Sequence, residues 1–65
     1  MPDGYYDDVR KILIELGYRK IGNAKGSHEK WQASTSQKTL IVPYNLMSRH
    51  TANAILKTAG HSGKL

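Results

Sequence analysis

The segment KGSHEKW, near the middle of the chain, combines residue types that can act on a phosphodiester. His28 supplies an imidazole. Such a group has an ordinary pKa of about 6.5, so it can serve as a general acid or base near neutral pH. Lys25 and Lys30 can balance charge on a phosphate, and the amides of Gly26 and Ser27 can donate hydrogen bonds to its oxygens. The segment therefore predicts metal-independent acid–base chemistry at His28.

RNA is the substrate that suits this chemistry. Its 2′-hydroxyl can attack the neighbouring phosphorus when a base removes the hydroxyl proton and an acid protonates the departing 5′ oxygen. The alternative is that His28 is an inert surface histidine beside a turn. His50, expected in the first turn of a helix, and His61, in the C-terminal tail, are weaker candidates. The chain has no cysteine, and its three histidines lie on separate elements, so no metal site is predicted.

Charge is distributed unevenly along the chain. The whole sequence carries a formal net charge of +5, but the segment from Leu16 onward has eight basic residues and one acid, Glu29, which gives +7. A polyanion is the natural partner of such a segment, and phosphate contacts would make its binding salt-dependent. This pattern favours a nucleic acid as partner, although the same charges can simply solubilise the protein.

Hydrophobic spacing predicts a helix over residues 5–16. Its apolar stripe is formed by Val9, Ile12, Leu13 and Leu16. Asp3 is a candidate cap and Gly17 a candidate terminator of this helix. A second helix is predicted in SRHTANAILKTAG, with Ser48 as its cap and Gly60 at its end. The tail after Gly60 is expected to fray.

Between the helices the pattern changes to strands. GYRKIGNAKGSHEKWQAS reads as two strands around a turn at NAKG, in which Asn23 and Gly26 can take a positive φ. TLIVP reads as a third strand that ends at Pro43. The predicted fold is α+β, in the order α-β-β-β-α, with a three-stranded antiparallel sheet and both helices on one face.

Alternation along the strands then sets the direction of each side chain. If the large ring of Trp31 points at the helices, His28 must point to the open face. Glu29 then points inward, so it must lie at the sheet margin or the strand must bulge. With Ile21 also inward, the open face should carry a cationic, hydrogen-bonding set of side chains. That set is Tyr18, Lys20, His28, Lys30 and Gln32.

Residues 1–65 are expected to form a single domain whose stability is small, so a stabilising partner is expected. The longest apolar runs, ILI and LIV, are too short to cross a membrane, and MPDGYYDD lacks the features of a signal peptide. A reducing cytoplasm is the expected location.

The chain resembles the HicA toxins, small ribonucleases of bacterial toxin–antitoxin pairs. KGSHEKW is similar to the family's Gly-Ser-His segment followed by an aromatic residue, TLIVP to its third strand, and TANAILKTAG to its closing helix. The resemblance implies a double-stranded-RNA-binding-domain-like fold and an mRNA endonuclease, working without metal, whose catalytic residue is His28. It also implies a HicB antitoxin that masks the site in a hetero-oligomer. Lys20, Lys25, Gly26, Ser27 and Lys30 are the expected RNA and phosphate ligands.

The sequence departs from this pattern at two places. Many relatives have a second histidine where this chain has Glu29, and many have a histidine after Val-Pro, where it has Tyr44 and Asn45. Lys30 or His50 are the candidates to fill a vacant acid or base role. Tyr44 is expected either to stack on a base or to close the core.

Two other functions are compatible with the sequence. One is a non-catalytic RNA-binding module that uses the same basic sheet face. The other is a protein-interaction domain with Tyr5, Tyr6 and Val9 at its interface. Salt-sensitive RNA binding is expected of the toxin and of the module alike, so cleavage is the property that separates them.

Overall fold

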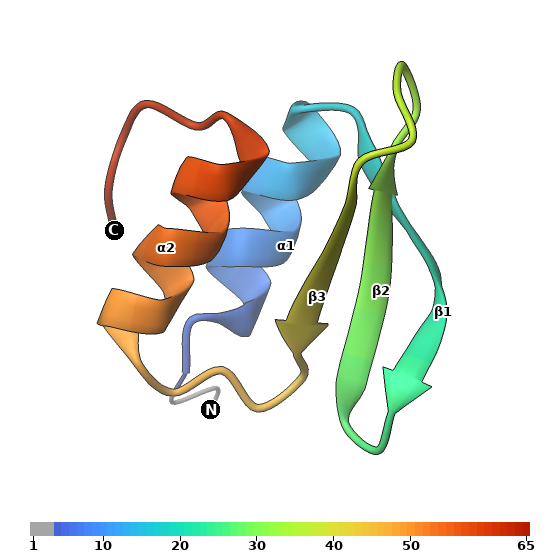
Figure 1. Ribbon diagram of the computed structural model, residues 1–65. Helices are drawn as coiled ribbons and strands as arrows, with labels where there is room; N and C mark the ends of the chain where they lie inside the picture. The colour runs from blue at the N-terminus through green and yellow to red at the C-terminus, as the bar shows by residue number, and fades with distance from the viewer. Residues whose placement is uncertain (1–3) are drawn as a thin grey trace.

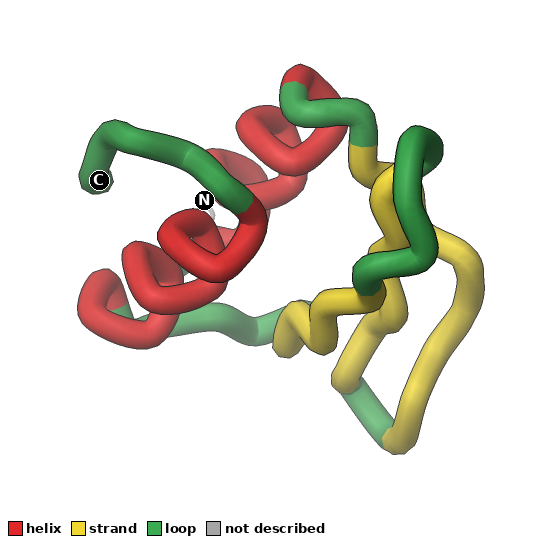
Figure 2. The backbone as a smooth tube through the Cα atoms, turned by 45° about the horizontal axis from the view of Figure 1, so that its top comes forward, coloured by secondary structure: helices red, strands yellow, loops and turns green. Residues whose placement is uncertain are grey.

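The computed structural model describes residues 4–65 and confirms the predicted order of elements (Figure 1). The elements are α1 (Tyr6–Glu15), β1 (Tyr18–Lys25), β2 (His28–Ala33), β3 (Thr39–Pro43) and α2 (Arg49–Ala59). The strands form one antiparallel sheet in the order β1-β2-β3. Both helices lie on the same side of this sheet (Figure 2), so the fold is α+β with one open sheet face.

The two helices run in the same direction and begin at one end of the sheet. The β1–β2 turn and the end of β3 lie at that same end (Figure 1). The backbone N–H groups at a helix start carry partial positive charge. The end of the molecule that contains the β1–β2 turn therefore also has the two positive helix ends.

Helix α1 begins and ends near the predicted residues. Tyr5 occupies its N-cap position without a side-chain hydrogen bond. Asp7 and Asp8 lie in its first turn, where their negative charge interacts favourably with the positive end of the helix dipole. Gly17 follows the helix, as predicted. The proposed cap Asp3 lies outside the described residues.

Helix α2 confirms both of its predicted boundaries. The Ser48 Oγ accepts a hydrogen bond from the Thr51 N–H at 3.2 Å, which satisfies a free donor in the first turn. Gly60 ends the helix in the left-handed conformation with a φ of 100°.

One hydrophobic core fills the space between helices and sheet. Val9 and Leu13 of α1 and Ala52 and Leu56 of α2 are buried, but Leu16, which was predicted in the apolar stripe of α1, is 39% exposed because it lies beyond the last turn of the helix. Leu46, in the loop before α2, is also buried, and its carbonyl accepts the Tyr5 N–H at 2.7 Å. The remaining core residues come from the strands: Tyr18, Trp31, Ala33, Leu40 and Val42.

Strand β1 differs from the prediction because its pairing with β2 is irregular at two places, between Lys20 and Gly22 and between Asn23 and Lys25. The pairing with β2 shifts by one residue between Lys20 and Gly22, and the extra residue is Ile21. The shift reverses the expected alternation at the start of the strand. Tyr18 is only 6% exposed and faces the helices, whereas Ile21 is 46% exposed. The predictions that Tyr18 points outward and Ile21 inward are therefore wrong.

Two loops also differ from their predictions. The β1–β2 turn consists of Gly26 and Ser27 alone, and Asn23, which has no positive φ, belongs to β1. The tail does not fray, because the Leu65 N–H donates to the Asn53 Oδ1 at 2.7 Å and Leu65 packs against the core. Within residues 4–65, no helix combines the length and apolar character needed to span a bilayer.

Candidate active site

The structure places His28 on the open face of the sheet, as the alternation argument predicted. Trp31 is 2% exposed and faces the helices, whereas His28 at the start of β2 is exposed. His28 pairs with Lys25 across the turn and with Pro43 of β3. Since paired residues in an antiparallel sheet point to the same face, Lys25 lies on the same open face.

The remainder of the open face continues along β2. Lys30 pairs with Gly22 on one side and with Ile41 on the other, and Gln32 pairs with Arg19 and Thr39. Lys30 therefore stands one strand repeat from His28 on the same face, beside a glycine that leaves room around its stem. Arg19 was not predicted as part of this face, because the bulge at Ile21 had not been anticipated.

One hydrogen bond orients the His28 ring. Its Nδ1 lies 3.2 Å from the carbonyl oxygen of Lys25. A carbonyl oxygen can only accept, so Nδ1 carries the hydrogen in this contact. In the neutral ring Nε2 then keeps its lone pair, and this nitrogen is the one available to a substrate.

The turn before His28 is open to a ligand. Gly26 has a φ of 58°, and the residue after it does not have a positive φ, which is the two-residue hairpin arrangement that prefers glycine at its first position. Nothing lies within 4 Å of the position that a Gly26 side chain would occupy. The backbone of Gly26 and Ser27 is therefore accessible to an anion at the same end of the sheet as His28.

Lys20 does not join the open face. It pairs with Trp31, and its Nζ lies 3.3 Å from the Glu29 Oε2 on the side of the helices. The prediction that Lys20 faces outward is wrong, because the bulge at Ile21 was not anticipated and it reverses the alternation on the Lys20 side of the strand. Its ammonium group is already used to neutralise a carboxylate.

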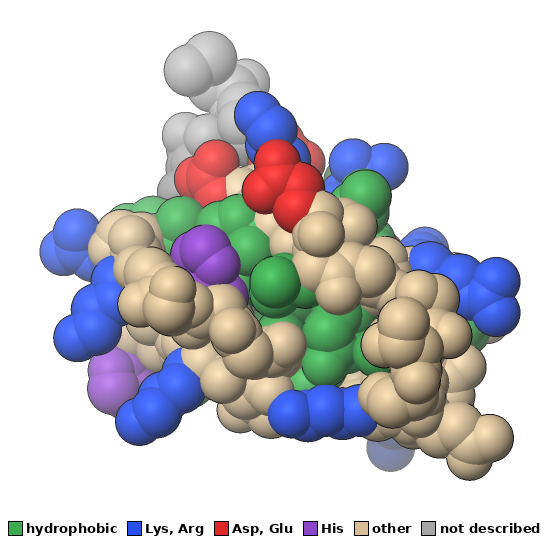
Figure 3. Space-filling view, turned by 90° about the horizontal axis from the view of Figure 1, so that it is seen from above, with side chains coloured by type: hydrophobic (Ala, Val, Ile, Leu, Met, Phe, Trp, Pro, Cys, Tyr) green, Lys and Arg blue, Asp and Glu red, His purple; other side chains and the backbone are tan. Residues whose placement is uncertain are grey.

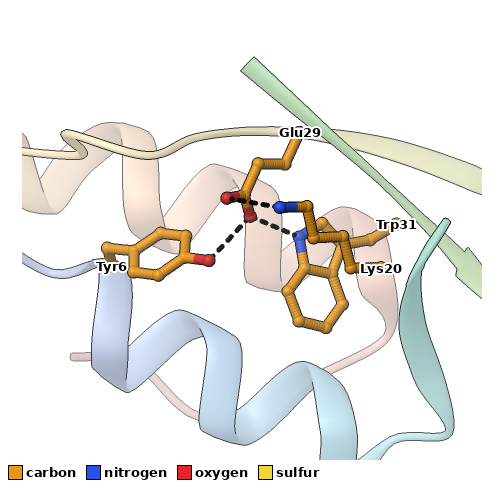
Figure 4. Close-up of polar contacts among 4 residues, drawn as sticks. All are labelled: Tyr6, Lys20, Glu29 and Trp31. Atoms are coloured by element: carbon orange, nitrogen blue, oxygen red, sulfur yellow. Dashed lines mark hydrogen bonds and ion pairs between the residues drawn. The ribbon is translucent and has the colours of Figure 1, made fainter. Parts of the chain in front are cut away.

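Glu29 is the centre of a buried polar cluster, shown in Figure 4, that links three elements. Its side chain faces inward and the residue is 6% exposed. The Oε1 accepts hydrogen bonds from the Tyr6 hydroxyl at 2.7 Å and from the Trp31 Nε1 at 3.1 Å, and the Oε2 faces Lys20. These contacts join α1, β1 and β2 directly behind His28.

The donors around Glu29 keep it ionised. Burial by itself raises the pKa of this carboxyl, but the hydrogen bonds from Tyr6 and Trp31 and the ammonium of Lys20 outweigh burial, so the pKa is lowered from its ordinary value of 4.5. From the sequence, an inward Glu29 was expected only at a sheet margin or beside a bulge. The structure accommodates it with three hydrogen-bonding or charged partners.

Tyr6 should titrate unusually late. Burial, then the hydrogen bond to Glu29 and the charge of that carboxylate, raise the pKa of the Tyr6 hydroxyl to about 12. A raised folded-state pKa stabilises the protein below pH 10, and this stabilisation is lost as the pH rises towards 12. Subtracting the tyrosinate absorbance of a Tyr6→Phe variant from that of the wild type should leave one transition near pH 12. A transition of this difference at pH 10 in folded protein would contradict the described contact.

The other candidate residues lie outside the strand that carries His28. Tyr44 is 61% exposed, so it does not close the core. His50 lies on α2 and lines a hollow with His61 and the C-terminal segment. Over residues 4–65 no group of three His, Asp or Glu side chains is arranged to hold a metal ion.

Basic side chains are not confined to the open sheet face. Figure 3, which views the molecule from the end opposite the β1–β2 turn, shows Lys and Arg spread around the outline and Asp and Glu gathered in one region. Asp7, Asp8 and Glu15 all belong to α1. On the open face, the strands described above contribute only cationic and neutral side chains.

The chain matches the model of one protein family over most of its length. Residues 6–61 match the family model described as HicA toxin of bacterial toxin-antitoxin. The chain belongs to the HicA toxin family. The match spans all five elements and leaves out only the residues before α1 and the end of the tail. It gives this HicA chain the role of toxin in a toxin–antitoxin pair.

No match to this HicA chain was found among curated proteins or among solved structures. The likeness to double-stranded-RNA-binding domains therefore stays a prediction. The element order, the antiparallel sheet and the placement of both helices on one face stand on the structure alone.

Proposed function

We propose that this HicA toxin is a metal-independent endoribonuclease that cleaves mRNA, with His28 as the group that transfers protons. One observation carries the proposal: His28 is exposed on a cationic sheet face, and its Nδ1 is held by the Lys25 carbonyl so that Nε2 is free. An oriented imidazole with one free nitrogen is the arrangement that general acid–base catalysis needs.

The reaction needs one base and one acid, and His28 can act as either. In the neutral form, Nε2 takes the proton of a 2′-hydroxyl, the 2′ oxygen bonds to the adjacent phosphorus, and the bond from phosphorus to the 5′ oxygen breaks. The leaving oxygen takes a proton from an acid, which leaves a 2′,3′-cyclic phosphate and a 5′-hydroxyl. Protonated His28 can instead supply that acid. Lys30, on the same face, is a candidate for the acid when His28 acts as the base, since Glu29 points to the helices.

The turn and the neighbouring lysines form the proposed phosphate-binding set. Lys25 and Lys30 share the face of His28, and the open backbone of Gly26 and Ser27 can donate to phosphate oxygens. Charge on the phosphorane is highest in the transition state, so these donors stabilise it more than they stabilise the bound substrate. We leave Lys20 out of the set because its ammonium is paired with Glu29.

The proposed antitoxin is a HicB-like protein that covers this open face in a hetero-oligomer. An acidic surface on that partner would complement Lys25, Lys30 and Arg19. Covering His28 would block access to RNA without any change within the toxin.

Incubation of RNA with the purified protein in EDTA separates the proposal from the RNA-binding module. The nuclease should produce fragments that end in 2′,3′-cyclic phosphate and begin with a 5′-hydroxyl. Intact RNA together with retained binding would instead favour the non-catalytic module.

Lys25→Gln and Lys30→Gln should each reduce the salt dependence of RNA binding. Each lost phosphate contact lowers the slope of log K against log salt by about 0.7 for a single strand. Fluorescence anisotropy of labelled RNA measures this slope, with Lys57→Gln in the last turn of α2 as the matched control. Unchanged slopes in both sheet variants would remove these lysines from the phosphate-binding set.

A further inference from the structure

The backbone of Tyr44, in the loop after β3, lies next to the β1–β2 turn that precedes His28. Its N–H donates to the carbonyl oxygen of Ser27 at 2.8 Å, and the preceding Pro43 pairs with His28. The end of β3 and the β1–β2 turn meet at the same end of the sheet (Figure 1). The backbone of Tyr44 is therefore fixed beside the residue that precedes His28.

The ring of Tyr44 is fixed in place but largely uncovered. The ring of Tyr6 lies beside it, at a centroid distance of 5.0 Å and an interplanar angle of 56°, so the rings are tilted and not stacked. Tyr6 is itself tied to Glu29 through its hydroxyl, which anchors the pair to β2. With 61% of Tyr44 exposed, its ring surface remains available for stacking.

A hollow of about 200 Å³ opens beside this ring. Its lining combines apolar surface with two polar side chains, and consists of Gly4, Tyr6, Asp7, Tyr44, Asn45, Leu46 and Met47. A side chain at Gly4 would overlap the carbonyl oxygen of Leu46, so the wall on that side is closely packed. The hollow has several times the volume of about 30 Å³ that one water molecule occupies in the liquid, so it has room for a larger group than water.

The polar groups of the hollow suit a nucleobase better than a phosphate. Asp7 would repel a phosphate, but its carboxylate can accept a hydrogen bond from an exocyclic amino group. Asn45 can both donate to and accept from a base edge. Anions are instead favoured at the turn and lysines on the other side of Ser27.

We propose that the hollow beside Tyr44 is a subsite for one nucleobase of the RNA whose phosphate lies at His28, and that it favours bases with an exocyclic amino group. The proposal rests on RNA being the substrate. In it, Tyr44 provides the stacking surface, Asp7 accepts from the amino group, and Asn45 contacts the base edge. Uracil, which lacks an amino group, is the disfavoured base.

Binding measurements on the full chain carrying His28→Ala test the subsite without cleavage. The probes are short labelled oligonucleotides of adenosine, of uridine, and of purine riboside, which has the adenine ring system without its amino group. The adenosine oligonucleotide should bind most tightly. Adding Tyr44→Ala should weaken its binding about tenfold, since stacking of one base contributes about 1–3 kcal/mol. Tyr44→Phe should bind within about twofold of the parent.

Asp7→Ala, which removes the acceptor, should bring the adenosine and purine riboside oligonucleotides to similar affinities while leaving the effect of Tyr44→Ala in place. Ile14→Ala, which shortens an exposed apolar side chain on α1 away from the hollow, is the matched control. Tyr44→Leu replaces Tyr44→Ala if the latter is unfolded by circular dichroism. Equal binding of the folded Tyr44 variants and their parent would overturn the subsite, even in a protein that cleaves RNA. Tyr44-dependent binding by a protein that never cleaves would support the subsite and refute the nuclease.

Discussion

His28→Ala should lower the rate of RNA cleavage by a factor on the order of 10² to 10⁴, the usual contribution of a positioned general acid or base. The expected loss lies in the rate, because the variant keeps Lys25, Lys30 and the turn that we propose to bind phosphate. Cleavage under single-turnover conditions measures the effect directly. His61→Ala, which alters a histidine near α2, should cleave at the wild-type rate.

A second substitution isolates proton transfer from the orientation of the side chain. The amide nitrogen of His28→Asn can still donate to the Lys25 carbonyl, but an amide cannot accept and return a proton near neutral pH. This variant should therefore be as inactive as His28→Ala. Because His28 is exposed, the free energy of unfolding of both variants should lie within about 0.5 kcal/mol of the wild-type value. Cleavage by either variant at the wild-type rate would exclude His28 from catalysis.

Glu29→Ala should destabilise the protein by about 3 kcal/mol. The substitution leaves the buried Trp31 Nε1 and the Tyr6 hydroxyl without their acceptor and Lys20 without its counter-charge. A domain of this length has a total stability of roughly 3–10 kcal/mol, so a large share of it is at risk. Denaturant unfolding of both proteins measures the difference.

Glu29→Gln is the matched control for this loss. Its amide oxygen can still accept from Tyr6 and Trp31, so it should cost roughly half as much as Glu29→Ala. Because the folded-state pKa of Glu29 is lowered, its stabilisation is present above pH 4.5 and is lost as the pH falls below that value. The free energy of unfolding should therefore fall less steeply in acid for Glu29→Gln than for the wild type. Equal acid dependence would show that Glu29 is not the group responsible.

Residues whose environment depends on local spacing could be predicted from the sequence. Helix α2 begins after Ser48 and ends at Gly60 as expected, since a cap and a left-handed terminator act within one helical turn. The outward direction of His28 followed from Trp31. The large ring of Trp31 must be buried, and residues three positions apart on a strand point to opposite faces.

Features that depend on distant contacts could not be predicted in this way. The bulge at Ile21 depends on the pairing of β1 with β2, so the directions of Tyr18 and Lys20 were wrong. The partner of Glu29 on α1 lies 23 positions away, and nothing in the local pattern around Glu29 indicates Tyr6. The uncovered ring of Tyr44 likewise follows only from the way the loop after β3 meets the turn.

Single 2′-deoxy substitutions in an otherwise unchanged RNA oligonucleotide provide the most direct test of the proposed attack by a 2′-hydroxyl. The purified protein should cleave the all-ribose strand in EDTA, and one deoxy substitution, at the nucleotide whose 2′-hydroxyl attacks, should stop cleavage at that bond. Cleavage that continues at the same bond without its 2′-hydroxyl, or an all-ribose strand that stays whole, would contradict the proposed reaction.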